Sequence, residues 1–224
     1  MKKLMTIAAL LSMTLSFHVS AMSAAPETGY TETRYPIVLV HGFLGWDTML
    51  GIDYWYQITE ALQEGGADVY VVTVPNANTP EVRGEELIPQ IEEILALTGA
   101  QRVNLIGHSH GGPTTRYVAS VRPELVASVT SVSGVNKGTP IADTLIATAE
   151  DSAAFDAIFG GIVNLAAEAL NLISGADYDD VNAMIAIASM TSERAVVFNQ
   201  QHPGGIPDSA CGEEGGEIGC PANR

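Results

Sequence analysis

Apolar and polar residues alternate along the chain in blocks that predict strands and helices in turn. Four short apolar runs, rich in β-branched residues, predict buried strands at residues 36–40, 68–74, 103–106 and 126–132. Helical spacing or helix-start residues stand between them, at residues 54–62, from 79 to about 95, and at 114–121. Because strands alternate with helices, the pattern predicts an α/β fold with a mainly parallel sheet covered on both faces.

The helix that begins near residue 79 has a clear start signal. Thr79 offers a hydroxyl as N-cap, and Pro80 suits the first helical turn, where no backbone N–H is needed. Leu87, Ile91 and Ile94 continue at helical spacing. Pro89 interrupts this pattern, and we expect it to kink the helix or to mark its true start.

A long apolar segment covers residues 141–190. Its central part has the i, i+3, i+4, i+7 spacing of a helix, carried by Phe155, Ile158, Phe159, Ile162 and Val163, with Leu170 and Ile173 further on. Such a helix is either an ordinary core helix or a lid whose apolar side faces an oily cleft. Polar residues within it, including Asp156 and Glu168, argue against a membrane span.

The first 24 residues have the pattern of a secretory signal peptide. Lys2 and Lys3 precede an apolar run over residues 4–17, and small residues at 20–21 and 23–25 offer cleavage sites. A transmembrane anchor fits less well, because the run is shorter than the ~20 residues that span a bilayer. We therefore expect the protein to be secreted. In that compartment Cys211 and Cys220 can pair, although the loop they would close is small.

Composition narrows the classes of function. The 224 residues include 10 Lys and Arg against 26 Asp and Glu, a formal net charge of -16, which makes a nucleic-acid partner unfavourable. Hydrophobic residues make up 46% of the chain, too many for a disordered protein and enough for one sizeable core. No group of Cys and His residues has the spacing of a zinc site.

The sequence Gly107-His108-Ser109-His110-Gly111 follows the third predicted strand and precedes a helix. A serine nucleophile on such a tight turn needs small neighbours, because larger side chains would collide as the turn closes. A Gly-x-Ser-x-Gly pattern also arises by chance, but the strand before it makes chance a poor explanation. We therefore predict Ser109 as a catalytic nucleophile, with a surface serine on a glycine-rich turn as the alternative.

A second segment agrees with this assignment. His41-Gly42-Phe43 follows the first predicted strand, a position from which a backbone amide can face the nucleophile. We expect the oxyanion hole to consist of the backbone amides of Phe43 and His110, the latter next to Ser109. The Phe43 side chain is as well suited to line an acyl pocket, and His41 suits a structural role beneath the hole.

Several blocks carry a resemblance to a known family. They are residues 35–42, 51–55, 81–85, 103–113 with 116–118, Lys137-Gly138, 205–207 and Ser209-Ala210-Cys211-Gly212. Together they resemble the secreted triacylglycerol lipases of Pseudomonas and Burkholderia. The resemblance implies an α/β-hydrolase fold over residues 25–224 with a helical lid at about 141–190. It also implies an acyl-enzyme mechanism at Ser109 on acylglycerols, a structural calcium ion and a membrane-anchored foldase.

The chain departs from that family after the Ser-Ala-Cys-Gly block. There the family has its catalytic acid, its histidine base and its calcium ligands, whereas here only residues 213–224 follow. Asp179 or Asp180 with His202 has the right order for a substitute pair, although His202 lies in a block that resembles a non-catalytic family segment. Three hypotheses remain: a lipase that is incomplete at its C-terminus, a compact esterase, polyester depolymerase or acyltransferase that uses Asp180 and His202, and an inactive hydrolase domain. We expect the 224 residues alone to have little esterase activity.

Overall fold

The computed structural model describes residues 29–175, 178 and 181–206. The predicted signal peptide, Asp179, Asp180 and both cysteines lie outside the described residues, so the predictions made for them are not tested by it.

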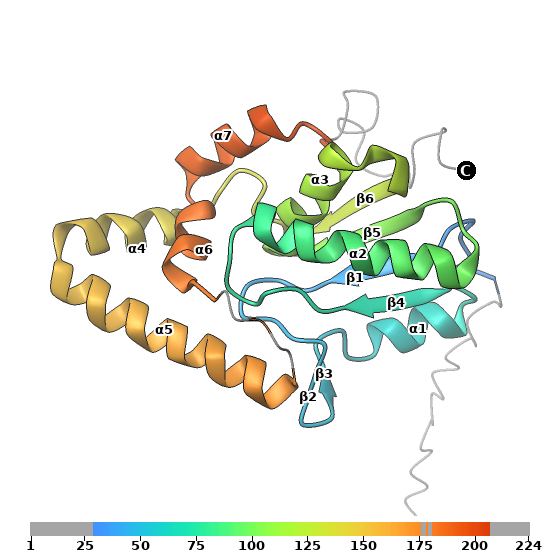
Figure 1. Ribbon diagram of the computed structural model, residues 1–224, viewed down its shortest axis with the longest axis horizontal. Coiled ribbons are helices and arrows are strands. Elements are labelled where there is room, and N and C mark those ends of the chain that lie inside the picture. Colours follow the sequence, from blue (N-terminus) through green and yellow to red (C-terminus); the bar gives the residue numbers. More distant parts are fainter. Residues whose placement is uncertain (1–28, 176–177, 179–180, 207–224) are drawn as a thin grey trace, which may run out of the picture.

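A parallel four-stranded sheet forms the centre of the molecule, with strand order β4-β1-β5-β6 (Figure 1). The strands are β1 (Ile37–Val40), β4 (Val69–Val72), β5 (Val103–His108) and β6 (Val126–Val132), and every pairing is parallel. This confirms the predicted α/β class, because four apolar runs separated by helices become four strands running the same way.

Helices cover both faces of the sheet. Alternate residues of β1 point to opposite sides: Val38 and Val40 pack with α2 (Pro80–Thr98) and α3 (Gly111–Val121), and Leu39 packs with Trp55 near α1 (Ile58–Glu64). Burial on both sides explains why β1 is continuously apolar. Each fully buried Val or Leu contributes about 1.5–3 kcal/mol relative to an exposed one.

The remaining elements lie beyond the carboxyl ends of the strands or at the margin of the sheet (Figure 1). They are the hairpin of β2 (Thr48–Met49) and β3 (Ile52–Asp53), the short helix η1 (Pro123–Leu125), and α4 (Pro140–Asp151), α5 (Ala153–Ser174), α6 (Ala183–Ser189) and α7 (Ser192–Gln201). The hairpin was not predicted, and neither were separate helices α6 and α7.

One predicted helix start is confirmed, and two others differ from the structure. The start of α2 is confirmed, because the Thr79 hydroxyl accepts a hydrogen bond from the Val82 amide, but Pro89 stands inside the helix and does not mark its start. The helix predicted from residue 54 begins only at Ile58, since Gln57 has a left-handed φ of 63°. The helix after Ser109 begins at Gly111, three residues earlier than predicted. Gly111 and Gly112 have low helix propensity, but there is no room for a side chain at either position.

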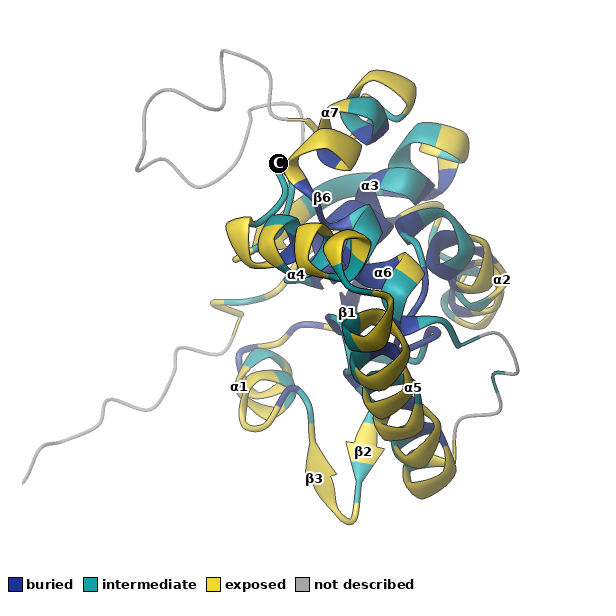
Figure 2. Ribbon diagram, turned by 90° about the vertical axis from the view of Figure 1, so that its left-hand side faces the viewer, coloured by how far each residue is buried: buried dark blue, intermediate teal, exposed yellow. Residues whose placement is uncertain are grey.

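The segment 141–190 is helical as predicted but is not a core helix. Only Gly160, Ala167 and Asn171 of α5 are buried, and Figure 2 shows most of the helix exposed. By length and composition alone α5 could also cross a membrane. In this fold its inner side packs on the domain, where the Asn76 side chain donates a hydrogen bond to the Ala167 carbonyl (2.9 Å).

Candidate active site

Ser109 occupies a strained turn between the end of β5 and the start of α3. Its φ is +53°, in the left-handed region that costs a residue other than glycine roughly 1–2 kcal/mol. Three backbone hydrogen bonds hold it there: its amide donates to the Val132 carbonyl of β6 (2.9 Å), and its carbonyl accepts from the amides of Gly112 (3.0 Å) and Val135 (3.4 Å). The predicted tight strand-to-helix turn is confirmed.

Neither glycine of the motif has room for a side chain. A Cβ built on Gly107 would overlap the backbone of Gly111, and one built on Gly111 would overlap the carbonyl of Val40 in β1. The turn therefore packs directly against the central strand. This is the steric reason given above for the pattern Gly-x-Ser-x-Gly.

The loop after β1 lies directly against Ser109. A Cβ built on Gly42 would lie 2.9 Å from the Cβ of Ser109 and 3.1 Å from the carbonyl of His108. The next loop amide, that of Leu44, donates to the Asn76 carbonyl (2.7 Å). Within the described residues, the amides of Phe43 and His110 donate no hydrogen bond. The structure thus brings together the loop and the turn that were predicted to supply the oxyanion hole.

A buried arginine holds this loop from below. The Arg83 guanidinium of α2 is fully buried, and its Nη2 donates to the carbonyl of His41 (2.6 Å) and, more weakly, to that of Gly42 (3.4 Å). Burial lowers the pKa of Arg83 to about 9, so it remains protonated at neutral pH. Arg83 belongs to a block that carried the family resemblance, but no role was predicted for it, because its partners lie 41 and 42 residues away in the sequence.

His41 is a structural residue beside Arg83, at the start of the loop after β1. Its Nδ1–H donates to the Gly42 carbonyl (2.9 Å), and its Nε2 accepts from the Val74 amide (3.3 Å). Burial, with the nearby Arg83 cation, lowers the pKa of His41 to about 3. Its full burial supports the structural role predicted for it.

A tyrosine joins the loop to the turn. The Tyr54 hydroxyl accepts from the Gly42 amide (3.1 Å) and lies 2.6 Å from Nδ1 of His108. The amide can only donate, so the hydroxyl accepts from Gly42 and bridges that amide to the ring of His108. Tyr54 belongs to a block that carried the family resemblance, but its role depends on contacts 12 and 54 residues away and was not predicted.

His110 connects the turn to the helices beyond the sheet. Its ring is fully buried, and its Nε2 lies 3.2 Å from the hydroxyl of Ser189, the last residue of α6. Ser189 donates its own proton to the Ala186 carbonyl (2.6 Å), so it accepts from Nε2–H of His110. Burial, followed by the charges of Arg83 and His41, lowers the pKa of His110 well below 6.5. The ring is therefore neutral.

An apolar cavity of about 290 Å³ opens beside Phe43. Its walls come from the loop after β1 and from the helices α4, α5 and α6, and all of its lining residues except Thr139 are apolar. The lining residues are Phe43, Leu44, Thr139, Ile141, Ala142, Leu145, Phe159, Val163, Ile187 and Met190. This volume is close to the lower end of the ~300–1,000 Å³ of small-molecule sites. Phe43 thus lines an apolar pocket, which was the role suggested for its side chain.

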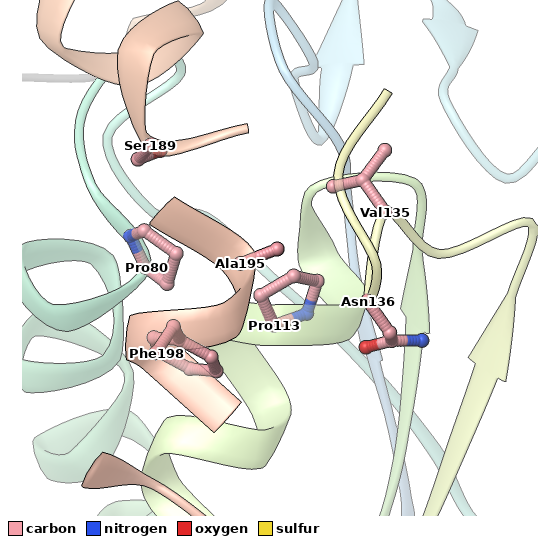
Figure 3. A pocket seen from close by; sticks show the side chains of 7 residues that line it. All are labelled: Pro80, Pro113, Val135, Asn136, Ser189, Ala195 and Phe198. Carbon is pink, nitrogen blue, oxygen red and sulfur yellow. The ribbon is translucent and has the colours of Figure 1, made fainter. Parts of the chain in front are cut away.

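A second, much smaller void lies behind the turn, where side chains from α2, α3, α6, α7 and the segment after β6 meet (Figure 3). Pro113 and Phe198 are among the residues that line it. Its volume is about 10 Å³, roughly the space of one water molecule. It is therefore a packing defect and not a substrate site.

His202 lies away from Ser109, against the far end of α3. Its ring centroid is 4.9 Å from that of Tyr117 and 4.9 Å from that of Phe198, and its carbonyl accepts from Arg116 (3.1 Å). Tyr117 is six residues beyond Gly111, the first residue of α3, which is about 9 Å along that helix from the turn that contains Ser109. The hypothesis that His202 serves as base is therefore wrong for this fold. Among the described residues, no Asp, Glu or His side chain bonds to Ser109.

Comparison with known proteins agrees with this arrangement. Residues 35–190 match the family model described as the alpha/beta hydrolase fold. The chain is 48% identical over 190 residues to a triacylglycerol lipase of Vibrio cholerae, covering 85% of this chain and 61% of that protein. It is 43% identical over 177 residues to one of Pseudomonas fragi, covering 79% and 60%, and 37% identical over 195 residues to one of Burkholderia plantarii, covering 84% and 53%. The chain thus spans about three fifths of the length of these relatives, or less.

Solved structures share the fold at low sequence identity. The mature form of a Bacillus licheniformis lipase aligns with a TM-score of 0.54 at 18% identity, over 79% of this chain and 61% of that one. A carboxyl esterase from a metagenome aligns with a TM-score of 0.52 at 16% identity, over 80% and 47%. Both support the arrangement of sheet and helices described above.

Proposed function

Because this chain belongs to the alpha/beta hydrolase family, we propose that it is the nucleophile-bearing part of a triacylglycerol lipase that acts through an acyl-Ser109 intermediate. One observation carries the proposal: Ser109 stands on a strained turn against the loop that contains Phe43, and the Phe43 side chain lines a largely apolar cavity. Within the described residues, the amides of Phe43 and His110 donate no hydrogen bond. The similarity to triacylglycerol lipases of three bacteria supports the substrate class.

The proposed chemistry begins with attack of the Ser109 hydroxyl on an ester carbonyl. The amides of Phe43 and His110 stabilise the resulting oxyanion, and the N-terminus of α3 adds a favourable field. Loss of the alcohol leaves an acyl-serine, which water then hydrolyses. The base that takes the serine proton, and the acid that orients it, are supplied by residues outside the described part of the chain.

Held in place before substrate arrives, the oxyanion hole needs little reorganisation. Arg83 fixes the carbonyl of His41, and Tyr54 fixes the amide of Gly42, the two groups that lead into Phe43. Pre-oriented donors of this kind contribute about 2.7–4 kcal/mol each to transition-state stabilisation. Arg83 and Tyr54 act as positioning residues, since neither touches the reacting atoms.

The apolar cavity suits the acyl chain of the substrate. Phe43 is one of its lining residues, so a carbonyl held by the Phe43 amide would have its hydrocarbon tail close to apolar walls. Burial of each methylene contributes about 0.8 kcal/mol. A chain of several carbons therefore binds more tightly than acetate, which favours medium- or long-chain esters.

We also propose that residues 141–190 form a lid. The inner side of α5 lines the cavity with Phe159 and Val163, while its outer side exposes Ile158 and Ile162. Such a helix gains stability at an oil surface, and hydrolysis should rise when substrate forms an emulsion. Replacing Phe159 and Ile162 by Ser should abolish that rise while sparing soluble short esters. An unchanged rise would show that α5 is not the lid.

Secretion and folding partners are part of the same proposal. The pattern of residues 1–24 supports export, and the family resemblance supports a membrane-anchored foldase. For the calcium ion that the resemblance implies, the described part of the chain contains no group of three or more acidic, His or Cys side chains that could bind it. No step above uses a metal.

The proposal is tested by adding the region of a relative that this chain does not cover. Residues 1–206 are joined to the C-terminal part of the Vibrio cholerae relative that this chain does not cover, and tributyrin hydrolysis is measured with and without Ser109→Ala. We expect hydrolysis that falls by several orders of magnitude in Ser109→Ala. Activity that survives this substitution would remove Ser109 from its assigned role.

The inactive-domain hypothesis predicts a different outcome. If the 224 residues bind lipid without hydrolysing it, tributyrin hydrolysis stays at the Ser109→Ala level while adsorption to droplets persists. The absence of a base bonded to Ser109 in the described residues favours this result for the chain alone. A robust activity of the 224-residue chain that depends on Ser109 would contradict it.

A further inference from the structure

The tip of the β2–β3 hairpin has an unusual residue in a demanding backbone position. A two-residue turn, Leu50-Gly51, connects the strands, with φ of +52° and +79°. Positive φ at both central positions is the signature of a type I′ turn, which favours Asn, Asp or Gly at its first position. A leucine here is strained, so stability of the turn does not explain it.

The same leucine is also exposed to an unusual degree. Leu50 is 84% exposed, and its neighbour Ile52 is 60% exposed. Residues 48–52 contain no charged side chain. The strands behind the tip are held by hydrogen bonds from the Trp46 indole to the Ile52 carbonyl (3.0 Å) and from Thr48 to Asp53 (2.7 Å). The result is an anchored loop that presents uncharged apolar side chains to the outside.

The hairpin is continuous with the exposed face of α5. The strand β2 packs against α5, and both elements are largely exposed in Figure 2. On α5 the outer side includes Leu165 and Leu172, and only Asp156 and Glu168 are charged along its 22 residues. Two apolar elements from distant parts of the sequence thus share one side of the molecule, next to the cavity that Phe43 lines.

We propose that Leu50 and Ile52 form an interfacial anchor that inserts into the surface of an uncharged lipid phase, beside α5. The inference rests on the proposed function, which requires the enzyme to reach substrate at such a surface. The net charge of -16 disfavours an anionic bilayer. A second protein copy is a poorer occupant, because both copies would carry the same net charge of -16 and repel each other.

The test separates anchoring from turn stability. Leu50→Asn creates Asn-Gly, the preferred type I′ pair, so the melting temperature should stay the same or rise. Removing the apolar side chain should weaken partition onto triolein droplets about tenfold, since burial of one leucine corresponds to a factor of ten or more. Partition is measured by flotation with the full chain carrying Ser109→Ala, so that hydrolysis plays no part.

Controls make each outcome informative. Leu97→Asn alters a leucine of α2 that is 72% exposed, and it should leave partition unchanged. Leu50→Gly also permits positive φ and should lose partition like Leu50→Asn. Equal partition of Leu50→Asn and the parent chain would overturn the proposal, whatever becomes of Ser109. The proposal would also be overturned if the chain bound phosphatidylglycerol vesicles and not triolein droplets. It would equally be overturned if sedimentation showed that the chain self-associates and that Leu50→Asn abolishes this self-association.

Discussion

Acid should destabilise this protein through its buried histidines, and His41 allows the effect to be worked out. Its ring is fully buried with both nitrogens bonded to backbone, and burial near Arg83 lowers its pKa to about 3. In the unfolded chain the same ring has a pKa of 6.5. Between these two values the unfolded state binds the proton and the folded state does not. Stability from His41 is therefore complete above pH 6.5 and is lost as pH falls towards 3.

The size of the effect follows from the pKa difference. At pH 5 the unfolded chain is 1.5 units below the pKa of its histidine, and each unit corresponds to about 1.36 kcal/mol. His41 alone should thus lower the free energy of unfolding by about 2 kcal/mol between pH 7.5 and pH 5. For a domain of this size, that corresponds to a drop of about 4–8 °C in melting temperature. His110 is buried and neutral as well, so its contribution has the same sign.

The contribution of His41 is isolated by measuring the urea unfolding of the parent and of His41→Gln at pH 7.5 and 5.0 and at fixed ionic strength. Gln keeps a donor and an acceptor but does not titrate. Carboxylates and His110 contribute equally to both proteins, so their effects cancel in the difference. We expect His41→Gln to start less stable but to lose about 2 kcal/mol less on acidification. Equal losses would show that His41 is not held neutral, and the same comparison with His110→Gln provides an independent check.

Three further predictions concern the turn and its surroundings. Gly107→Ala should destabilise the fold by more than about 3 kcal/mol in urea, because its Cβ overlaps the backbone of Gly111. The matched change Gly161→Ala meets nothing within 4 Å and should be neutral or stabilising by up to about 1 kcal/mol; similar results for both would refute the steric argument. Tyr54→Phe should cost about 1–3 kcal/mol in thermal unfolding, because it leaves the Gly42 amide unpaired; a change below 0.5 kcal/mol would contradict the bridge. His202→Ala should not alter any Ser109-dependent esterase rate, and a large loss would reinstate His202 as base.

Local patterns in the sequence determined the fold class of this protein and the turn that carries Ser109. The apolar run of β1 predicts a strand covered on both faces, and Thr79 with Pro80 predicts the start of α2, because these signals act through the backbone of neighbouring residues. The spacing of Gly107, Ser109 and Gly111 likewise predicts a tight turn, since a side chain on Gly107 would overlap the backbone of Gly111 within the same five residues. For that reason the fold class and the nucleophile candidate were accessible without a structure.

The tertiary structure decided what depends on distant partners. Periodicity alone cannot distinguish a core helix from a surface helix, and only packing showed that α5 is largely exposed. The roles of Tyr54 and Arg83 depend on partners 12 to 54 residues away, and the position of His202 depends on its packing against Tyr117 and Phe198. The turn at Leu50 was missed because its residue opposes the usual preference. Short-range steric requirements depend on neighbouring residues and can be predicted from the sequence. Burial and long-range hydrogen bonds arise only when the folded chain brings separate segments together.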